Sequence, residues 1–285
     1  MKYDIATDIK LVEELLGCNS ADLANAIGVN RSTLARWESG TSSPSQTTLD
    51  AFYDYAFSRG IRLNAIKAQL YKEQIESAKE RVLFHGAKTV IEGTLSLEKS
   101  HSSNDFGKGF YCGESLEQSA LFVAAYPSSS IYVTSFSPQG CKKASYEVDQ
   151  NWMLTVAWYR GKLLPYADHP AIKKLVKRVE GADYIVAPIA DNRMFEIIDS
   201  FIDGEITDIQ CQHCLSATNL GKQYVFVSEK ALGQVRLIER CFLSTAEKKD
   251  YLSAKQEESR IGTDKVKVAR KQFRNQGKYI EELLA

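Results

Sequence analysis

The stretch of residues 20–40, SADLANAIGVNRSTLARWESG, constrains the start of this chain more than any other segment. Apolar residues recur at helical spacing on both sides of Gly28: Leu23, Ala26 and Ile27 before it, and Leu34 and Trp37 after it. Ser20 and Asn30 stand where helix N-caps are expected, and Gly28 and Gly40 stand where helices end. The pattern predicts two short helices joined by a tight glycine turn.

A further amphipathic segment, TTLDAFYDYAFSRG, follows as a supporting helix, and together these segments give the helix-turn-helix arrangement. The stretch also resembles the Cro/repressor (XRE-type) family. In that family the N-terminal residues of the second helix contact base edges in the major groove of DNA. The resemblance implies DNA contacts by Asn30, Arg31, Ser32, Thr33 and Arg36. We therefore expect residues 1–60 to form an all-α XRE-type helix-turn-helix domain.

The charge of this domain leaves a second interpretation open. Residues 1–60 carry five basic and eight acidic groups, a net charge of −3. Affinity for DNA that does not depend on base sequence comes mainly from neutralising phosphates with basic side chains. The domain therefore either binds DNA through a few clustered arginines or serves as a protein-docking or dimerisation module.

The whole-chain composition excludes several classes of protein. The 285 residues suffice for two domains, and 36 basic residues balance 36 acidic ones, so total charge indicates no nucleic-acid partner. No apolar run approaches about 18 residues, and the N-terminus has no signal-peptide pattern, so no membrane partner is expected. The six scattered cysteines are typical of a reducing compartment. We expect a cytoplasmic protein.

One cysteine pair has the spacing of a metal site. Residues 211–214 read CQHC, but a structural zinc site usually combines two such pairs, and no second pair exists. Haem attachment requires histidine where Leu215 stands. Free thiols and no metal are expected.

After residue 60 the pattern changes. The segment IRLNAIKAQLYKEQIESAKERV predicts a linker helix over residues 61–80. Residues 81–244 mix helical runs with the short strand-like runs RVLFHG, IYVTSFS, DYIVAPI, KQYVFVS and VRLIERCFL, which favours a mixed or antiparallel α+β domain. Residues 245–285 predict a charged helical tail. Its KVKVARKQFRNQGK segment fits a solvated helix face or a contact with nucleic acid or a partner.

Residues 105–113, DFGKGFYCG, contain neither GxGxxG nor GxxxxGK[ST], so they are not a phosphate-binding loop of either kind. Upstream, LFHGA ends a strand with His85 and Gly86, and downstream GKQYVFVSEKAL begins a strand at Gln223. Motifs of this kind in this order resemble the ADP-ribosyltransferase fold, in its diphtheria-toxin and poly-ADP-ribose-polymerase branch. The resemblance implies a split, mixed or antiparallel β-sheet.

The chain resembles an uncharacterised bacterial family of the same fold more closely than it resembles the toxin and polymerase branch. It shares DFGKGFY, a PIADDR-like segment (here PIADNRMF, residues 188–195) and a QYVF strand followed by KAL. The resemblance covers about residues 81–240.

The resemblance implies an NAD+ site. His85 would bind the adenosine-side ribose, and the backbone of Gly86 would bind the nicotinamide amide. Tyr111 would flank the nicotinamide ring, with Phe122 as a second aromatic wall and Ser119 as a hydroxyl on the amide. In the DFGKGFY turn, Gly107, Gly109 and Phe110 would line the cofactor, the glycines by letting the backbone turn tightly.

The third catalytic position is Gln223, where this branch usually has glutamate. An amide can bind a ribose hydroxyl but places no full negative charge beside the oxocarbenium-like transition state. Asp191 is a candidate for a compensating carboxylate, with Arg193 as a diphosphate partner. Asp191 also fits a simple helix cap, and both interpretations stay open. Ala87 stands where polymerases often have serine.

The resemblance implies an NAD+-dependent mono-ADP-ribosyltransferase with His85, Tyr111 and Gln223 as catalytic residues. The acceptor would be a protein or a nucleic acid, selected by the loop CQHCLSATNLGK. A toxin or phage-defence role with a cognate antitoxin is a hypothesis from the domain combination. The alternatives are a non-catalytic regulator that senses NAD+ or ADP-ribose, and an NAD+ glycohydrolase.

Overall fold

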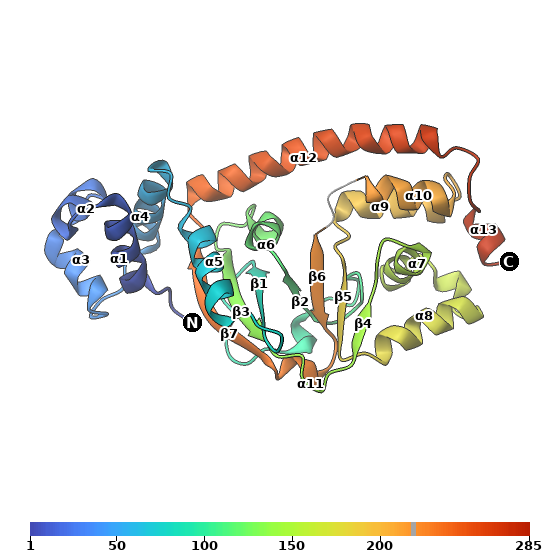
Figure 1. The fold of residues 1–285 in the computed structure, drawn as a ribbon, viewed down its shortest axis with the longest axis horizontal. Helices are drawn as coiled ribbons and strands as arrows, with labels where there is room; N and C mark the ends of the chain where they lie inside the picture. The colour runs from blue at the N-terminus through green and yellow to red at the C-terminus, as the bar shows by residue number, and fades with distance from the viewer. Residues whose placement is uncertain (218–220) are drawn as a thin grey trace. The chain divides into compact units, whose positions relative to one another are not determined.

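The structure is a computed structural model that describes residues 1–217 and 221–285 (Figure 1). The chain divides into two compact units, each described by itself. The first contains residues 1–93, 115–136 and 236–254, and the second contains residues 94–114, 137–235 and 255–285.

The first unit begins with the helix-turn-helix. Its helices are α1 (Ile5–Leu16), α2 (Ser20–Ala26), α3 (Arg31–Glu38) and α4 (Gln46–Ser58), and α5 (Leu63–Ile75) follows. The side chain of Asn19, not of Ser20, caps α2 by accepting from the backbone N–H groups of Ala21 and Asp22. Asn30 is the N-cap residue of α3, but its side chain makes no capping hydrogen bond. The first cap was therefore predicted one residue too late.

The same unit contains three strands and one more helix: β1 (Arg81–Ala87), α6 (Leu116–Val123), β3 (Ser130–Phe136) and β7 (Val235–Phe242). The strand order is β1-β3-β7, and β1 pairs antiparallel with β3. Helices α5 and α6 contact β1, as Figure 1 shows. The long helix α12 (Thr245–Gln272) begins in this unit.

The helix-turn-helix shares its hydrophobic core with β7. Phe242 belongs to the same buried cluster as Leu23, Leu34 and Phe52, and its ring stacks on Tyr53 at 5.0 Å. The segment expected to be only a linker contributes to this region, since Asn64 and Lys67 of α5 are buried.

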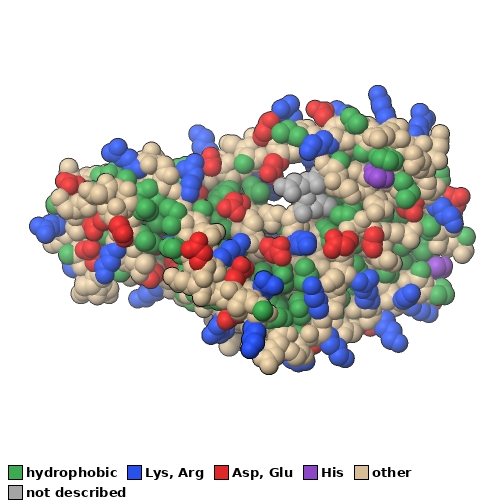
Figure 2. Space-filling model, in the orientation of Figure 1, with side chains coloured by type: hydrophobic (Ala, Val, Ile, Leu, Met, Phe, Trp, Pro, Cys, Tyr) green, Lys and Arg blue, Asp and Glu red, His purple; other side chains and the backbone are tan. Residues whose placement is uncertain are grey.

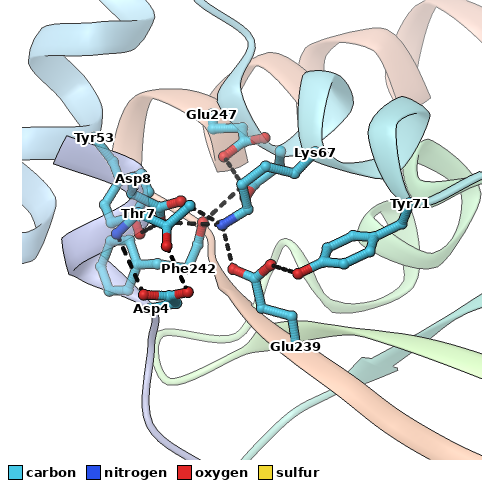
Figure 3. A network of polar contacts seen from close by, with 10 residues as sticks. Asp4, Thr7, Asp8, Tyr53, Lys67, Tyr71, Glu239, Phe242 and Glu247 are labelled. Atoms are coloured by element: carbon cyan, nitrogen blue, oxygen red, sulfur yellow. Dashed lines mark hydrogen bonds and ion pairs between the residues drawn. The ribbon is translucent and has the colours of Figure 1, made fainter. Parts of the chain in front are cut away.

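A buried polar network joins the same elements (Figure 3). Lys67 donates to both carboxylate oxygens of Asp8 at 2.7 and 3.0 Å, and it also pairs with Glu239 of β7. Tyr53 donates to Asp8, and Tyr71 donates to Glu239 at 2.8 Å. A lysine between two carboxylates neutralises charges that would be costly to bury alone.

The second unit contains the strand order β4-β5-β6-β2. The strands are β2 (Phe110–Gly113), β4 (Lys143–Ser145), β5 (Tyr184–Pro188) and β6 (Lys222–Phe226). The helices are α7 (Gln150–Tyr159), α8 (Pro170–Glu180), α9 (Asn192–Ile202), α10 (Asp208–Ser216), α11 (Glu229–Leu232) and α13 (Ile280–Leu283), with short 3-10 turns at Leu97–Lys99 and Leu164–Tyr166. The rest of α12 completes the unit.

In this unit β6 pairs antiparallel with both β2 and β5, whereas β4 pairs parallel with β5. The expected α+β class with mixed strands is therefore confirmed. Two strands were missed: the end of DFGKGFYCG is strand β2 rather than a continued turn, and β4 is only three residues long.

Candidate functional site

In the helix-turn-helix, Gly28 adopts φ of +72°, which L side chains rarely adopt, and lets α2 turn sharply into α3. Leu34 and Trp37 are buried, as predicted. Of the expected DNA contacts, Asn30, Arg31, Ser32 and Arg36 are exposed and Thr33 is half-buried. Arg36 donates to the Thr33 hydroxyl at 3.1 Å.

The charge on this domain is mixed on the face seen in Figure 2, where acidic and basic side chains alternate over the helix-turn-helix. A continuous basic patch is not present on that face. This arrangement agrees with the negative charge counted from the sequence. Any contact with DNA phosphates would therefore depend mainly on the few exposed arginines of α3.

In the first unit, His85 and Gly86 lie on β1 opposite Tyr132 and Ile131 of β3. Gly86 is required by packing, because a Cβ there would overlap the backbone carbonyl of Ser119 on α6. The Ser119 hydroxyl is buried and donates to the carbonyl of Phe84 at 2.8 Å. The expected histidine-glycine strand end and the serine helix thus lie against each other.

Phe122, on the same helix α6, is 51% exposed. An aromatic side chain with half its surface in water is available to contact a ligand or a partner. Its expected role as an aromatic wall stays a prediction.

In the second unit, the DFGKG segment forms a turn that holds Tyr111. The Tyr111 hydroxyl donates to the carbonyl of Gly107 at 2.8 Å and accepts from the N–H of Phe106 at 3.1 Å. Burial, reinforced by the nearby Asp105, raises the pKa of the Tyr111 hydroxyl above its usual value. The hydroxyl stays protonated at neutral pH and ties the ring to its own turn.

The two glycines of this turn are needed for different reasons. Gly107 adopts φ of +74°, and a Cβ there would lie 2.8 Å from the ring of Tyr159. A Cβ at Gly109 would lie 2.8 Å from a methyl group of Val225 on β6. The tight turn is as expected, and the space beside each glycine is filled by the protein's own side chains. Phe110 is buried, with its ring 6.3 Å from that of Phe226.

The strand register relates Tyr111 to Gln223. Tyr111 of β2 lies opposite Val225 of β6, and Gly113 lies opposite Gln223. Directly opposed residues of antiparallel strands share one face of the sheet, as do residues two apart on one strand. Tyr111 and Gln223 therefore lie on the same face, as diagonal neighbours.

Gln223 belongs to a buried polar cluster that the sequence did not predict. Its amide nitrogen donates to Asp105 at 2.9 Å and to the carbonyl of Pro188 at 2.9 Å. Arg160, just after α7, donates to the other oxygen of Asp105 at 2.6 and 3.1 Å. The carboxylate in contact with Gln223 is thus Asp105, the first residue of the glycine motif. Arg160 gave no signal in the sequence.

Asp191 and Arg193 have other contacts. Asp191 caps α9 by accepting from the N–H of Met194 at 2.9 Å, which is the second interpretation of the sequence. The guanidinium of Arg193 packs over Gly262 of α12, where a Cβ would overlap it. Neither residue contacts the Gln223 cluster through a hydrogen bond in the described part of the chain.

The CQHC segment lies on α10. Cys211 and Cys214 are buried free thiols whose sulfurs contact the carbonyls of Ile197 and Val266. Within residues 1–217 and 221–285, no group of three or more His, Cys, Asp or Glu side chains suits a metal ion. Part of the loop expected to select the acceptor, residues 218–220, lies outside the described residues. Across the described ranges, no helix has the length and hydropathy to span a bilayer.

Two family models match the chain. Residues 9–52 match a family described as helix-turn-helix, and residues 81–237 match a family described as protein of unknown function (DUF3990). No curated protein and no solved structure matches the chain. The predicted helix-turn-helix is confirmed, whereas ADP-ribosyltransferase activity stays a prediction. Because the second match covers more than half of its length, the chain belongs to the DUF3990 family and carries an N-terminal helix-turn-helix.

Proposed function

We propose that the protein is an NAD+-dependent mono-ADP-ribosyltransferase in which Tyr111 and Gln223 contact the cofactor. His85 stays a catalytic residue that the resemblance implies. The observation that carries this proposal is the strand register, which puts Tyr111 and Gln223 on one face of the β2–β6 pair. There an aromatic ring and a polar group lie diagonally adjacent. The aromatic ring can flank the flat nicotinamide ring, and the polar group can bind the ribose hydroxyl beside it.

The chemistry sets what these groups must do. Breaking the bond between nicotinamide and ribose develops positive charge on the ribose, so a pre-oriented polar group at that point lowers the barrier. The Tyr111 ring is held in its own turn because its hydroxyl donates one hydrogen bond to the Gly107 carbonyl and accepts another from the Phe106 N–H.

The test uses the full-length protein with NAD+ labelled in its adenylate part and a cell lysate as the source of acceptors. We expect label on a macromolecule, and we expect His85→Ala to abolish it. His101→Ala, at an exposed position, is the matched control and should retain activity. Free labelled ADP-ribose without transfer would identify an NAD+ glycohydrolase. Intact NAD+ bound to the protein would refute the enzyme and leave an NAD+ sensor.

We also propose that the helix-turn-helix binds DNA through α3. The support is the exposure of Arg31 and Arg36 at the start and end of this helix. Fluorescence anisotropy with DNA from upstream of the protein's own coding sequence should show binding that weakens with salt. Arg31→Ala should remove it, while Arg59→Ala, an exposed arginine on α4's C-terminal side, should not. No binding at low salt would favour the protein-docking interpretation.

A further inference from the structure

The amide of Gln223 has a fixed orientation. Both neighbours of its nitrogen, the Asp105 carboxylate and the Pro188 carbonyl, are acceptors, each at 2.9 Å. An amide nitrogen has two hydrogens to donate, so this pairing uses both of them. The side chain is buried, with 6% of its surface exposed. Any hydrogen bond between Gln223 and a ligand would therefore use the amide oxygen, which can only accept.

Asp105 is held as firmly as the amide. One of its oxygens accepts twice from Arg160, and the other accepts from Gln223 and from the N–H of Ala190 at 3.1 Å. Arg160 in turn donates to the carbonyl of Ala190 at 2.6 Å, and its guanidinium lies 4.2 Å from the ring centroid of Phe195. Four donors on a buried carboxylate, two of them from an arginine, make a rigid charged support.

We propose that Asp105 is a positioning residue that makes Gln223 an obligate hydrogen-bond acceptor for a ribose hydroxyl of NAD+. The inference rests on the proposed transferase activity. With both hydrogens directed at Asp105 and Pro188, the amide presents only oxygen, as a carboxylate would. That oxygen carries a partial negative charge, which would stabilise the positive charge that develops on the ribose.

The same geometry accounts for glutamine at a position where the ADP-ribosyltransferases that the sequence resembles usually have glutamate. A glutamate at 223 would direct an oxygen at two acceptors, one of them the charged Asp105. Repulsion between two carboxylates and the loss of both hydrogen bonds would displace the side chain. Glutamine is thus the residue that Asp105 requires, and it is compatible with an active site.

A double-mutant cycle tests this pairing, using Asp105→Asn, Gln223→Glu and the combination of both. Each single change disturbs the match of donor and acceptor. Asp105→Asn turns an NH2 group either toward the donors of Arg160 or toward those of Gln223 and Ala190. Gln223→Glu makes carboxylate face carboxylate. The combination restores one donor and one acceptor at the same net charge. We expect each single variant to lower kcat for nicotinamide release by about 100-fold, with little change in KM. The double variant should recover at least about tenfold over the weaker single variant.

Thermal unfolding of all four proteins accompanies the kinetics, and Gln223→Met is a fifth variant that removes the oxygen without adding repulsion. It should fold, bind NAD+ and lose turnover. A Gln223→Glu enzyme as active as the wild type, or a double variant no better than the worse single one, would overturn the inference.

Failure of the proposed function gives a different result. If the wild type bound NAD+ without consuming it, the catalytic role would fall with the transferase proposal. The orientation of the amide would still be decided by Tm, since it requires that Gln223→Glu lowers Tm and that the second change restores it. An unchanged Tm in Gln223→Glu would show that Asp105 does not orient the amide.

Discussion

Replacing Lys67 by methionine is the most direct test of how the helix-turn-helix is held to β7. Methionine has a similar length but no charge, so Asp8 and Glu239 would face each other without a cation. The three side chains are 3%, 1% and 7% exposed, which leaves little water to take the place of the ammonium group.

The expected loss in the free energy of unfolding follows from the contacts that the two carboxylates keep in the variant. Tyr53 still donates to Asp8 and Tyr71 still donates to Glu239, but neither carries a positive charge. Removing one partner from a buried ion pair commonly costs about 3–5 kcal/mol in the free energy of unfolding. Because Lys67 serves two carboxylates, we expect the variant to lie within this range at neutral pH.

The pH dependence gives a second signature. Burial already raises the pKa of the Asp8 carboxyl, and Lys67 lowers it only in part. Without Lys67, desolvation and repulsion from the Glu239 carboxylate raise the folded-state pKa of the Asp8 carboxyl further above its unfolded value. An acid with a raised folded-state pKa contributes its full stability below the unfolded pKa and loses it as pH rises through the folded pKa. The penalty in Lys67→Met should therefore be larger at pH 8 than at pH 4.5.

The assay is urea unfolding at both pH values, with hydrogen exchange to locate the loosened elements. Combining Lys67→Met with Asp8→Asn and Glu239→Gln removes the charges of all three side chains and should recover most of the lost stability. Lys173→Met, at an exposed ion pair, is the control and should leave stability unchanged. A loss below about 1 kcal/mol, or one that does not shrink at acid pH, would refute the reasoning, as 3–5 kcal/mol is the range for a broken buried pair.

Three further changes have expected outcomes. Gly107→Ala forces a side chain into a positive φ and against the ring of Tyr159, so it should cost about 1–3 kcal/mol by thermal unfolding. Burial raises the pKa of Glu247 from 4.5 to about 7, so its stability contribution falls as pH rises through about 7. Glu247→Gln should then be more stable than the wild type by up to about 3 kcal/mol at pH 8 and no more stable below pH 4.5, as urea titrations would show. Asp50→Ala removes the acceptor for the N–H of Thr245 and should cost about 1 kcal/mol in urea unfolding.

Local sequence patterns were sufficient to predict most of the strands. Strands β1, β3, β5, β6 and β7 each carry a run of β-branched and aromatic residues, and each was predicted. Strand β2 was missed because FYCG is only four residues long and follows a glycine turn. Its strand character comes from pairing with β6, which lies more than a hundred residues later. A contact at that sequence separation leaves no periodic signal.

The same limit separates the predicted from the unpredicted parts of the candidate site. The positive φ of Gly107 and the capping by Asp191 are local properties, and both were readable from residue type and neighbours. The pairing of Gln223 with Asp105 spans 118 residues, and Arg160 reaches the same carboxylate from beyond α7. The sequence offered Asp191 as a candidate carboxylate beside Gln223, whereas the fold supplies Asp105 from the start of the glycine motif.

The sequence pattern changes at residue 60, but the hydrophobic core of the helix-turn-helix includes residues beyond that position. The family match covers residues 9–52, yet the core of the helix-turn-helix includes Phe242, and Lys67 neutralises Asp8. A fragment of residues 1–60 would expose the apolar surface that Phe242 covers, so it should unfold at lower urea concentration than the same helices in the full chain. Its Asp8 would face water, so Asp8→Asn should change the fragment little. In the full chain the same change should cost several kcal/mol, because Lys67 loses a buried partner. Equal effects in both would mean that the helix-turn-helix is an independent domain.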